Sequence, residues 1–314
     1  MDAYLPGRAL RNPHLQTTRS RLLPPRVRLP EPEVVLVDMP DGSGDRLALL
    51  LHEGDPDKPL VLVIHGLGGS AESDYVRYLA AGLIGAGFPV GRLDLRGAGT
   101  GEHAVGMYHG GKTEDVRAVI DSLDRPVAVV GFSLGGNLTI KLLGEHTDHV
   151  VAGVAVSAPL DLAVSVEHLH HMAGGLYEKF LVHRLRKEAL RRGARYTPEE
   201  RAGIVAAKGL VEFDNAVTAP RHGWRDAAEY YAVNSSIDYL DKVELPLLLI
   251  HSKDDPMVPF GPYLSVDWEA LPTTELVLTD HGGHVGFHSR GRPPYYVGLS
   301  VEFLDRVSGT PDPA

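Results

Sequence analysis

The chain of 314 residues contains no cysteine. This absence excludes disulfide bridges, thiolate metal sites and cysteine nucleophiles, and it leaves oxygen nucleophiles as the plausible covalent catalysts. The chain also lacks any run of the roughly 18 to 20 apolar residues that a membrane-spanning helix needs. Residues 1–30 are rich in Arg and Pro and lack the continuous apolar core of a secretory signal. We therefore predict a cytoplasmic protein with no transmembrane segment.

Basic charge is in short supply as well. The chain has 31 Lys and Arg against 41 Asp and Glu, a formal net charge of −10. A nucleic-acid partner is not expected, because binding phosphates requires clustered Lys and Arg. One basic cluster occurs, at residues 183–195, and it fits the solvated face of a charged helix better than a phosphate or lipid headgroup contact.

Apolar runs alternate with helical patterns along the chain, which is typical of strands joined by helical crossovers in a mostly parallel sheet. From the third run onward the runs are nearly continuous in Val, Leu and Ile, as in strands covered by helices on both faces. The first two runs are expected to form an antiparallel edge. We predict an eight-stranded, mostly parallel α/β sheet with strands at 34–37, 47–52, 60–64, 90–95, 127–130, 150–156, 247–251 and 275–278, and flanking helices at 74–85, 112–123, 134–144, 262–270 and 294–307.

No convincing buried strand lies between residues 159 and 244. This interval has an amphipathic helical stretch near 162–192, a second after Thr197, which can cap a helix that Pro198 begins, and a third near 225–233. We predict a helical cap insertion at residues 159–245. The core would consist of residues 1–158 and 246–314, with an N-terminal arm at about 1–32.

Ser133 is the candidate nucleophile. Residues 127–136 read Val-Ala-Val-Val-Gly-Phe-Ser-Leu-Gly-Gly, so an apolar strand runs into a Gly-x-Ser-x-Gly turn and then into a helical pattern. In a nucleophile elbow, the serine occupies a strained turn between strand and helix, and side chains at the flanking glycines would collide with neighbouring backbone. The alternative is an ordinary glycine-rich turn capped by serine, but the strand and helix on either side favour the elbow.

A serine nucleophile needs an imidazole to take its proton and a carboxylate to orient that imidazole. In proteins with this elbow, the acid and then the histidine follow the serine, each at the carboxyl end of a later strand. The seventh strand ends in His-Ser-Lys-Asp-Asp-Pro-Met-Val-Pro, which offers Asp254 and Asp255. Asp255 is preferred because Pro256 holds the preceding residue in an extended turn. Asp254 can instead form a turn or cap the helix after Pro262.

Three histidines, His281, His284 and His288, follow the eighth strand. The two glycines before His284 suggest a turn that lets its ring reach across the sheet, so His284 is the candidate base and His281 the second choice. A metal site is not expected, because no His-Glu-x-x-His motif and no complementary set of carboxylates occurs. The proposed chemistry requires no cofactor.

An acyl-transfer site also needs donors for the oxyanion of its tetrahedral intermediate. After the third strand comes His-Gly-Leu-Gly-Gly at residues 65–69, a bend that leaves backbone N–H groups free. We predict that the N–H groups of Leu67 and Leu134 form the oxyanion hole. The segment after the fourth strand, with Asp94 and Arg96, is expected to be a structural turn held by charge-assisted hydrogen bonds.

With these loops in place, the chain resembles the α/β-hydrolase superfamily over nearly its whole length. Two motifs outside the catalytic loops are similar to the bacterial YheT-type hydrolases: Asn-Pro-His-Leu-Gln-Thr at 12–17, and Phe-Asp-Asn-Ala-Val-Thr-Ala-Pro at 213–220, followed by Gly-Trp and Tyr-Tyr. That branch includes the yeast medium-chain fatty-acid ethyl ester synthase/esterases and animal phospholipase-like relatives. Asn-Ala-Val at 215–217 replaces a more charged stretch, and Trp224 stands where Phe is usual.

The resemblance implies that Ser133 is the nucleophile, Asp255 the triad acid and His284 the base. It implies hydrolysis of small-molecule carboxylic esters with short- to medium-chain acyl groups. Two alternatives stay open: an acyltransferase or ester synthase that uses the same acyl-enzyme, and a non-catalytic ligand-binding protein. The sequence does not indicate an oligomeric state. One further feature is an apolar stripe at helical spacing, which suggests either an acyl pocket or ordinary packing between cap and core. It consists of Leu162, Leu169, Met172, Leu176, Tyr177 and Phe180.

Overall fold

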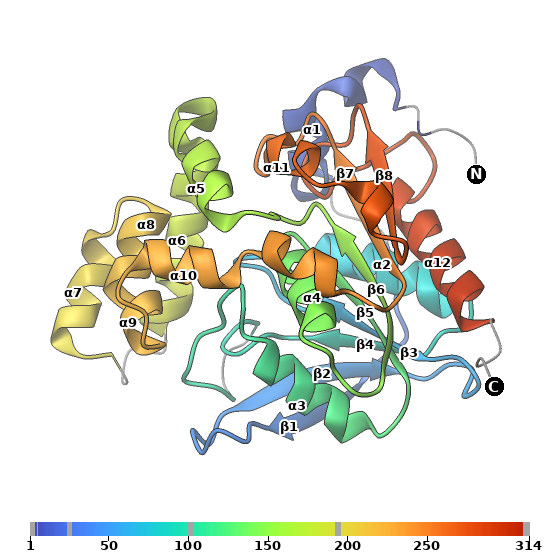
Figure 1. The fold of residues 1–314 in the computed structure, drawn as a ribbon, viewed down its shortest axis with the longest axis horizontal. Coiled ribbons are helices and arrows are strands. Elements are labelled where there is room, and N and C mark those ends of the chain that lie inside the picture. Colours follow the sequence, from blue (N-terminus) through green and yellow to red (C-terminus); the bar gives the residue numbers. More distant parts are fainter. Residues whose placement is uncertain (1–3, 5, 24–26, 100–102, 192–195, 310–314) are drawn as a thin grey trace.

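An eight-stranded sheet forms the centre of the fold (Figure 1). The structure is a computed structural model and describes residues 4, 6–23, 27–99, 103–191 and 196–309. The spatial order of the strands is β1-β2-β4-β3-β5-β6-β7-β8. Strand β2 runs antiparallel to both of its neighbours, and the other pairs are parallel, so the predicted sheet and its antiparallel edge are confirmed. The strands are β1 Glu33–Asp38, β2 Arg46–His52, β3 Leu60–Ile64, β4 Val90–Leu93, β5 Val127–Phe132, β6 Val150–Val156, β7 Leu247–Ser252 and β8 Thr274–Thr279.

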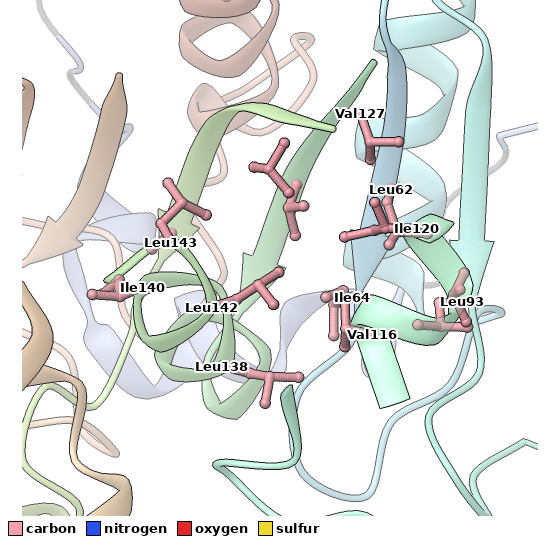
Figure 2. Close-up of a cluster of buried hydrophobic side chains, with 14 of the residues drawn as sticks. Leu62, Ile64, Leu93, Val116, Ile120, Val127, Leu138, Ile140, Leu142 and Leu143 are labelled. Atoms are coloured by element: carbon pink, nitrogen blue, oxygen red, sulfur yellow. The ribbon is translucent and has the colours of Figure 1, made fainter. Parts of the chain in front are cut away.

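Helices cover both faces of the sheet, and this explains the unbroken apolar runs of the central strands. Alternate residues of β3 enter opposite cores: Leu62 and Ile64 pack toward α3 (Thr113–Leu123) and α4 (Leu134–Gly144), and Val61 and Val63 join the core of α2 (Asp74–Gly85) and α12 (Tyr295–Ser308). Figure 2 shows side chains of α3 and α4 meeting those of β3 in the first core. Because the central strands are parallel, their carboxyl ends share one edge, where ligands bind in open α/β sheets.

The part of the chain between β6 and β7 that the structure describes is helical. Helices α5 to α10 gather to one side of the sheet (Figure 1). Residues of α5 to α8 form an apolar cluster that includes Leu185, Ile204 and Phe213, and residues of α9 and α10 belong to a second, smaller cluster. The predicted boundaries of a cap at 159–245 stay a prediction. The elements are α5 Leu162–His171, α6 Leu176–Arg191, α7 Pro198–Ala206, α8 Leu210–Phe213, a π-helical turn Asp214–Thr218, α9 Ala219–Arg221, α10 Ala227–Asn234 and a 3-10 helix Ser236–Lys242.

Local chemistry sets several helix ends. Thr197 and Glu200 form a reciprocal capping box at the start of α7, as the Thr-Pro-Glu-Glu sequence predicts. The predicted helix near 162–192 is interrupted at Met172–Gly175, because Ala173 and the two glycines after it have positive φ angles of 51°, 65° and 74°. Left-handed residues cannot continue a right-handed helix. Residues 192–195 lie outside the described residues, and they include the last residue of the predicted helix and the end of the basic cluster.

The predicted helix at 262–270 is also shorter than expected. It consists of α11 (Gly261–Leu264) and a 3-10 turn at Trp268–Ala270. The residues between them, Ser-Val-Asp, favour caps and strands over helix interiors. Within the ranges that the structure describes, no helix combines the length and apolarity needed to cross a bilayer.

Two arginines of the basic cluster contradict the prediction of a solvated helix face. On α6, the Arg184 guanidinium donates a hydrogen bond to the carbonyl of Gly68, and Arg186 donates to the carbonyls of Ile204, at 3.0 Å, and Ala207. Carbonyl groups left over at helix ends and in tight loops are strong acceptors for guanidinium N–H groups. The two side chains therefore tie α6 to the loop after β3 and to the end of α7.

Candidate active site

Ser133 forms the turn between β5 and α4, with φ 51° and ψ −120°. The glycines around it are needed because neighbouring backbone comes very close. A Cβ atom at Gly131 would lie 2.0 Å from the carbonyl oxygen of Gly135, and one at Gly135 would lie 2.5 Å from the carbonyl oxygen of His65. Such a strained backbone, which costs about 1 to 3 kcal/mol, holds the serine hydroxyl out at the edge of the sheet.

The structure brings the three predicted residues Ser133, His284 and Asp255 into one hydrogen-bonded chain. His284 Nε2 lies 3.0 Å from Ser133 Oγ, and His284 Nδ1 lies 2.9 Å from Asp255 Oδ2. A carboxylate only accepts hydrogen bonds, so Nδ1 of the neutral ring carries the proton and donates it to Asp255. Nε2 is then the acceptor for the serine hydroxyl, which is the arrangement that general-base catalysis requires.

Asp255 and Asp254 have different partners. The backbone N–H groups of Met257 and Val258 donate to Asp255 Oδ1, at 2.8 and 3.0 Å. Burial disfavours the ionised carboxyl, but the facing His284 and these N–H groups outweigh it and lower the pKa of Asp255 below its usual range. Asp254 accepts from the Gly283 N–H at 2.9 Å and lies 3.2 Å from His281 Nδ1. Asp254 therefore holds the loop that carries His284, and it does not cap α11.

The loop after β3 is held rigidly beside the elbow. The N–H groups on either side of Leu67 are engaged, that of Gly66 by the Tyr75 hydroxyl at 3.0 Å and that of Gly68 by the Tyr108 hydroxyl at 2.6 Å. Leu134 is the first residue of α4, and the first N–H groups of a helix have no intrahelical acceptor and favour negative charge. Leu67 and Leu134 line one cavity together. These features suit an oxyanion hole at the predicted pair.

His65 connects this loop to the segment that follows β4. Its Nδ1 donates to the Gly66 carbonyl at 2.7 Å, and its Nε2 accepts the Leu95 N–H at 3.2 Å. Burial lowers the pKa of His65, so the ring stays neutral in this tautomer. Beyond it, Arg96 makes a bidentate, buried ion pair with Asp115 and a third contact with Asp45 at 3.0 Å. The predicted structural role of Arg96 is confirmed.

The cavity next to Leu67 and Leu134 has a volume of about 60 Å³ and mostly apolar walls. Of the apolar stripe suggested as an acyl pocket, Leu162 lines this cavity. Leu169 is instead part of the apolar cluster of the cap helices, and Leu176 is 65% exposed. The stripe as a whole is therefore not an acyl pocket. Within the described ranges, no three acidic or histidine side chains are grouped as a metal site would require.

Sequence reasoning missed the part that helix α1 (Pro13–Leu22) plays at the site. Thr17 Oγ1 accepts the His284 N–H at 2.9 Å. The buried Gln16 accepts the His288 N–H at 2.7 Å and donates to the His288 carbonyl at 3.0 Å. At Gly283, with φ 58°, a Cβ atom would lie 2.6 Å from the Pro13 carbonyl oxygen. The motif at 12–17 was the available signal, but nothing in it indicates that it supports a loop some 270 residues away.

Replacing Gln16 with alanine is expected to lower kcat/KM for an ester by about 10- to 100-fold, because the loop carrying His284 loses its support and small displacements are costly. The free energy of unfolding should fall by about 1 to 3 kcal/mol, since buried polar groups are left unpaired. Steady-state kinetics and urea unfolding measure the two effects. Leu15→Ala, on the same helix but 46% exposed, is the matched control and should change neither quantity appreciably. Equal effects of the two substitutions would contradict this role.

His288 connects the same two segments and gives the fold a pH dependence. Burial lowers the pKa of His288 to about 4, and its Nε2 lies 3.0 Å from Ser20 Oγ on α1. The unfolded value is about 6.5. The unfolded chain therefore binds more protons at this residue below pH 6.5, so the stabilisation by neutral His288 is complete above pH 6.5 and is lost as pH falls through 4.

Between pH 7.5 and 4.5, His288 should contribute about 2 to 3 kcal/mol to the loss of unfolding free energy. Urea unfolding of the original protein and of His288→Gln at both pH values measures this contribution. Glutamine does not titrate, so the variant should lose less stability on acidification by that amount. Other buried histidines titrate alike in both proteins and cancel in the comparison. Parallel pH profiles would show that His288 is not involved.

Comparisons with known proteins agree with this geometry. Residues 59–290 match the α/β hydrolase fold family. YheT of Escherichia coli K12, whose name describes it as an esterase, is 34% identical over 296 residues, 90% of this chain and 86% of YheT. The medium-chain fatty acid ethyl ester synthase/esterase 2 of Saccharomyces cerevisiae is 29% identical over 287 residues, which cover 80% of this chain and 62% of the yeast protein. This chain therefore spans less than two thirds of that relative.

A solved structure shows the same fold. The Pyrococcus furiosus esterase Pf2001 superposes with a TM-score of 0.61 and 21% sequence identity, over 91% of this chain and 97% of the esterase. The predicted fold and the resemblance to the YheT-type branch are confirmed by these matches. The chain belongs to the α/β-hydrolase fold family.

Proposed function

We propose that the chain is a serine carboxylic ester hydrolase that acts on small-molecule esters through an acyl-enzyme. The observation that carries the proposal is the hydrogen-bonded chain from Ser133 Oγ through His284 to Asp255. The names of relatives such as YheT support ester hydrolysis as the general activity.

In the proposed reaction, His284 Nε2 takes the proton of Ser133 as Oγ attacks the ester carbonyl. The oxyanion of the tetrahedral intermediate accepts hydrogen bonds from the N–H groups of Leu67 and Leu134, each worth about 3 kcal/mol of transition-state stabilisation. His284 then gives its proton to the leaving alcohol. Water, deprotonated by the same ring, then attacks the acyl carbonyl. As the bond to Ser133 Oγ breaks, the ring returns the proton to Oγ and the acid is released. Asp255 stays ionised throughout and stabilises the imidazolium, in agreement with its lowered pKa.

The cavity beside the oxyanion loop favours short acyl groups. A water molecule needs about 10 to 15 Å³ of such a volume, so about 60 Å³ has room for roughly four groups of that size. A larger hollow of about 460 Å³ lies between α5 and α10, but neither Leu67 nor Leu134 lines it. Within the predicted range of short- to medium-chain esters, we propose that the short end is preferred.

Labelling with a fluorophosphonate probe, followed by mass spectrometry of the peptides, tests the nucleophile, because only an activated serine reacts rapidly. We expect the probe on Ser133, together with hydrolysis of p-nitrophenyl esters that is fastest near four carbons. No labelling and no turnover would refute an enzyme and favour a non-catalytic ligand-binding protein. A rate that rises steadily toward twelve carbons would refute the short-chain preference.

Acyl transfer is the second candidate, because the yeast relative is named as a synthase as well as an esterase. An alcohol would then capture the acyl-enzyme in place of water. Adding ethanol to the reaction and measuring ethyl butyrate by gas chromatography separates the two: a hydrolase gives mainly butyrate, and a synthase gives mainly the ethyl ester. The cytoplasmic location stays a prediction, which cell fractionation tests.

A further inference from the structure

An acidic side chain lies in the wall of the cavity beside the oxyanion loop, and no step of the proposed reaction uses it. Asp214 lines the same cavity of about 60 Å³ as Leu67 and Leu134. Because the two leucines of the predicted oxyanion hole and Asp214 share this cavity, a short chain of an ester bound at the hole can extend along the wall that contains Asp214. The remaining walls are largely apolar, with Leu162 and Phe213 among them.

The hydrogen bonds of Asp214 leave part of its acceptor capacity free. Thr218 donates to Oδ1 at 2.6 Å, and Tyr231 donates to Oδ2 at 2.7 Å. An ionised carboxylate has roughly four acceptor positions, so about two stay unoccupied. Burial raises the pKa of Asp214 to about 6, against the opposing effect of these two hydroxyl groups. The carboxyl is thus mostly ionised at pH 7 and above.

No lysine or arginine forms an ion pair with Asp214 among the residues described. Asp214 is only partly buried, but removing part of the hydration of a carboxylate without a cation nearby still costs free energy, and such groups are uncommon outside functional sites. Asp214 also begins a π-helical turn that ends at Thr218. Turns of this kind are rare and occur frequently at functional sites. Cavity, unpaired acceptor positions and backbone geometry all coincide at this residue.

His109 is a second polar residue of the cavity wall, and it affects which kind of donor group the cavity suits. His109 accepts the Gly111 N–H through Nδ1 at 3.1 Å, and burial lowers its pKa well below the usual value. The ring is therefore neutral, with its proton on Nε2. A cavity that offers an acceptor and a donor suits a hydroxyl group, which can donate to one and accept from the other. An ammonium group can only donate, and the apolar walls would desolvate it.

We propose that Asp214 is a specificity-determining residue that accepts a hydrogen bond from an aliphatic hydroxyl group of the substrate, a few bonds from the ester. The hydroxyl belongs either to a hydroxyacyl group or to a polyhydric alcohol such as glycerol, according to which half of the ester enters the cavity. The effect of this hydrogen bond on turnover rests on the proposed function. The test therefore also includes a binding measurement, which does not depend on that function.

Two matched substrate pairs distinguish the sources: p-nitrophenyl 3-hydroxybutyrate against p-nitrophenyl butyrate, and glycerol monobutyrate against propyl butyrate. The original protein should favour the hydroxyl-bearing member of one pair by about 10- to 100-fold in kcat/KM, the range of a hydrogen bond to a charged group. Asp214→Asn should reduce that preference by about tenfold and change turnover of p-nitrophenyl butyrate far less. A preference below threefold in both pairs, or one that survives in Asp214→Asn, would overturn the proposal.

Tyr231→Phe is the control for a purely structural role. It removes the hydrogen bond between Asp214 and α10 but keeps the carboxylate, so both variants should lower the melting temperature by similar amounts. The hydroxyl preference should persist in Tyr231→Phe. If it disappears there as well, Asp214 acts only by holding the helices together, and the proposal fails.

Binding separates this proposal from the proposed function. In the Ser133→Ala background, calorimetric titration with ethyl 3-hydroxybutyrate and ethyl butyrate, and with the glycerol and propyl esters, gives affinities without turnover. One hydroxyl ester should bind at least tenfold more tightly than its partner, and the additional Asp214→Asn substitution should abolish the difference. If the original protein had no esterase activity, only the catalytic role of Ser133 would be refuted. Equal affinities within both pairs would refute the role of Asp214 alone.

Discussion

Replacing Ser133 with alanine is expected to reduce hydrolysis of p-nitrophenyl butyrate by about 10⁴-fold or more, because the residues of a triad act as a unit and the remaining groups have no nucleophile to activate. The expected effect is this large because no cysteine is present to replace the serine. Among the described residues, the Ser133 hydroxyl is also the only one hydrogen-bonded to His284 Nε2, at 3.0 Å. Steady-state kinetics at substrate saturation measure it.

The melting temperature should stay nearly unchanged in this variant. Alanine fits the space that serine occupies, and both residues experience the same strain at a φ of 51°. Ser122→Ala, on the exposed side of α3, is the control for handling and folding and should keep full activity. Activity within tenfold of the original protein would refute Ser133 as the nucleophile. Lost activity with a collapsed melting curve would be a folding effect, and fluorophosphonate labelling of Ser133 in the original protein would then test the assignment.

Most of the sheet and the convergence of the candidate site could be predicted, because the signals are local. A strand buried on both faces must be apolar throughout, and a turn as tight as Gly131 to Gly135 must have glycines where backbone atoms approach within 2.0 to 2.5 Å. Parallel strands bring their carboxyl ends to one edge. The loops after β3, β5, β7 and β8 therefore had to meet, although the roles of their residues stay proposals.

The supporting contacts could not be predicted, because they join distant segments through ordinary polar residues. Gln16 and Thr17 have the composition of any helix surface, and only the folded chain places them against the loop of His284. Arg184 belongs to a run of charges typical of a solvated face, but the carbonyl of Gly68 lies within its reach. The hydrogen-bond acceptor of a polar side chain can lie at any distance along the sequence, and the local sequence pattern does not indicate its position.

Replacing Asp255 with asparagine is expected to reduce kcat by about 10⁴-fold, and Asp254→Asn by no more than about tenfold. The two substitutions are isosteric and adjacent. At position 255, an amide nitrogen facing His284 Nδ1 would donate a hydrogen bond and move the ring proton to Nε2, so the ring could no longer accept the serine proton. At position 254, an asparagine oxygen can still accept the Gly283 N–H, which holds the loop in place.

Steady-state kinetics with p-nitrophenyl butyrate, together with melting curves, separate a lost charge from a lost fold. Asp255→Asn should keep most of its stability, because its oxygen can still accept the Met257 and Val258 N–H groups. The opposite order of effects would make Asp254 the triad acid and would require His281 or a rearranged His284 loop to serve as the base. Equal and small losses would mean that the imidazole works without an ionised partner. Either result would contradict the hydrogen-bonded chain on which the proposed reaction depends.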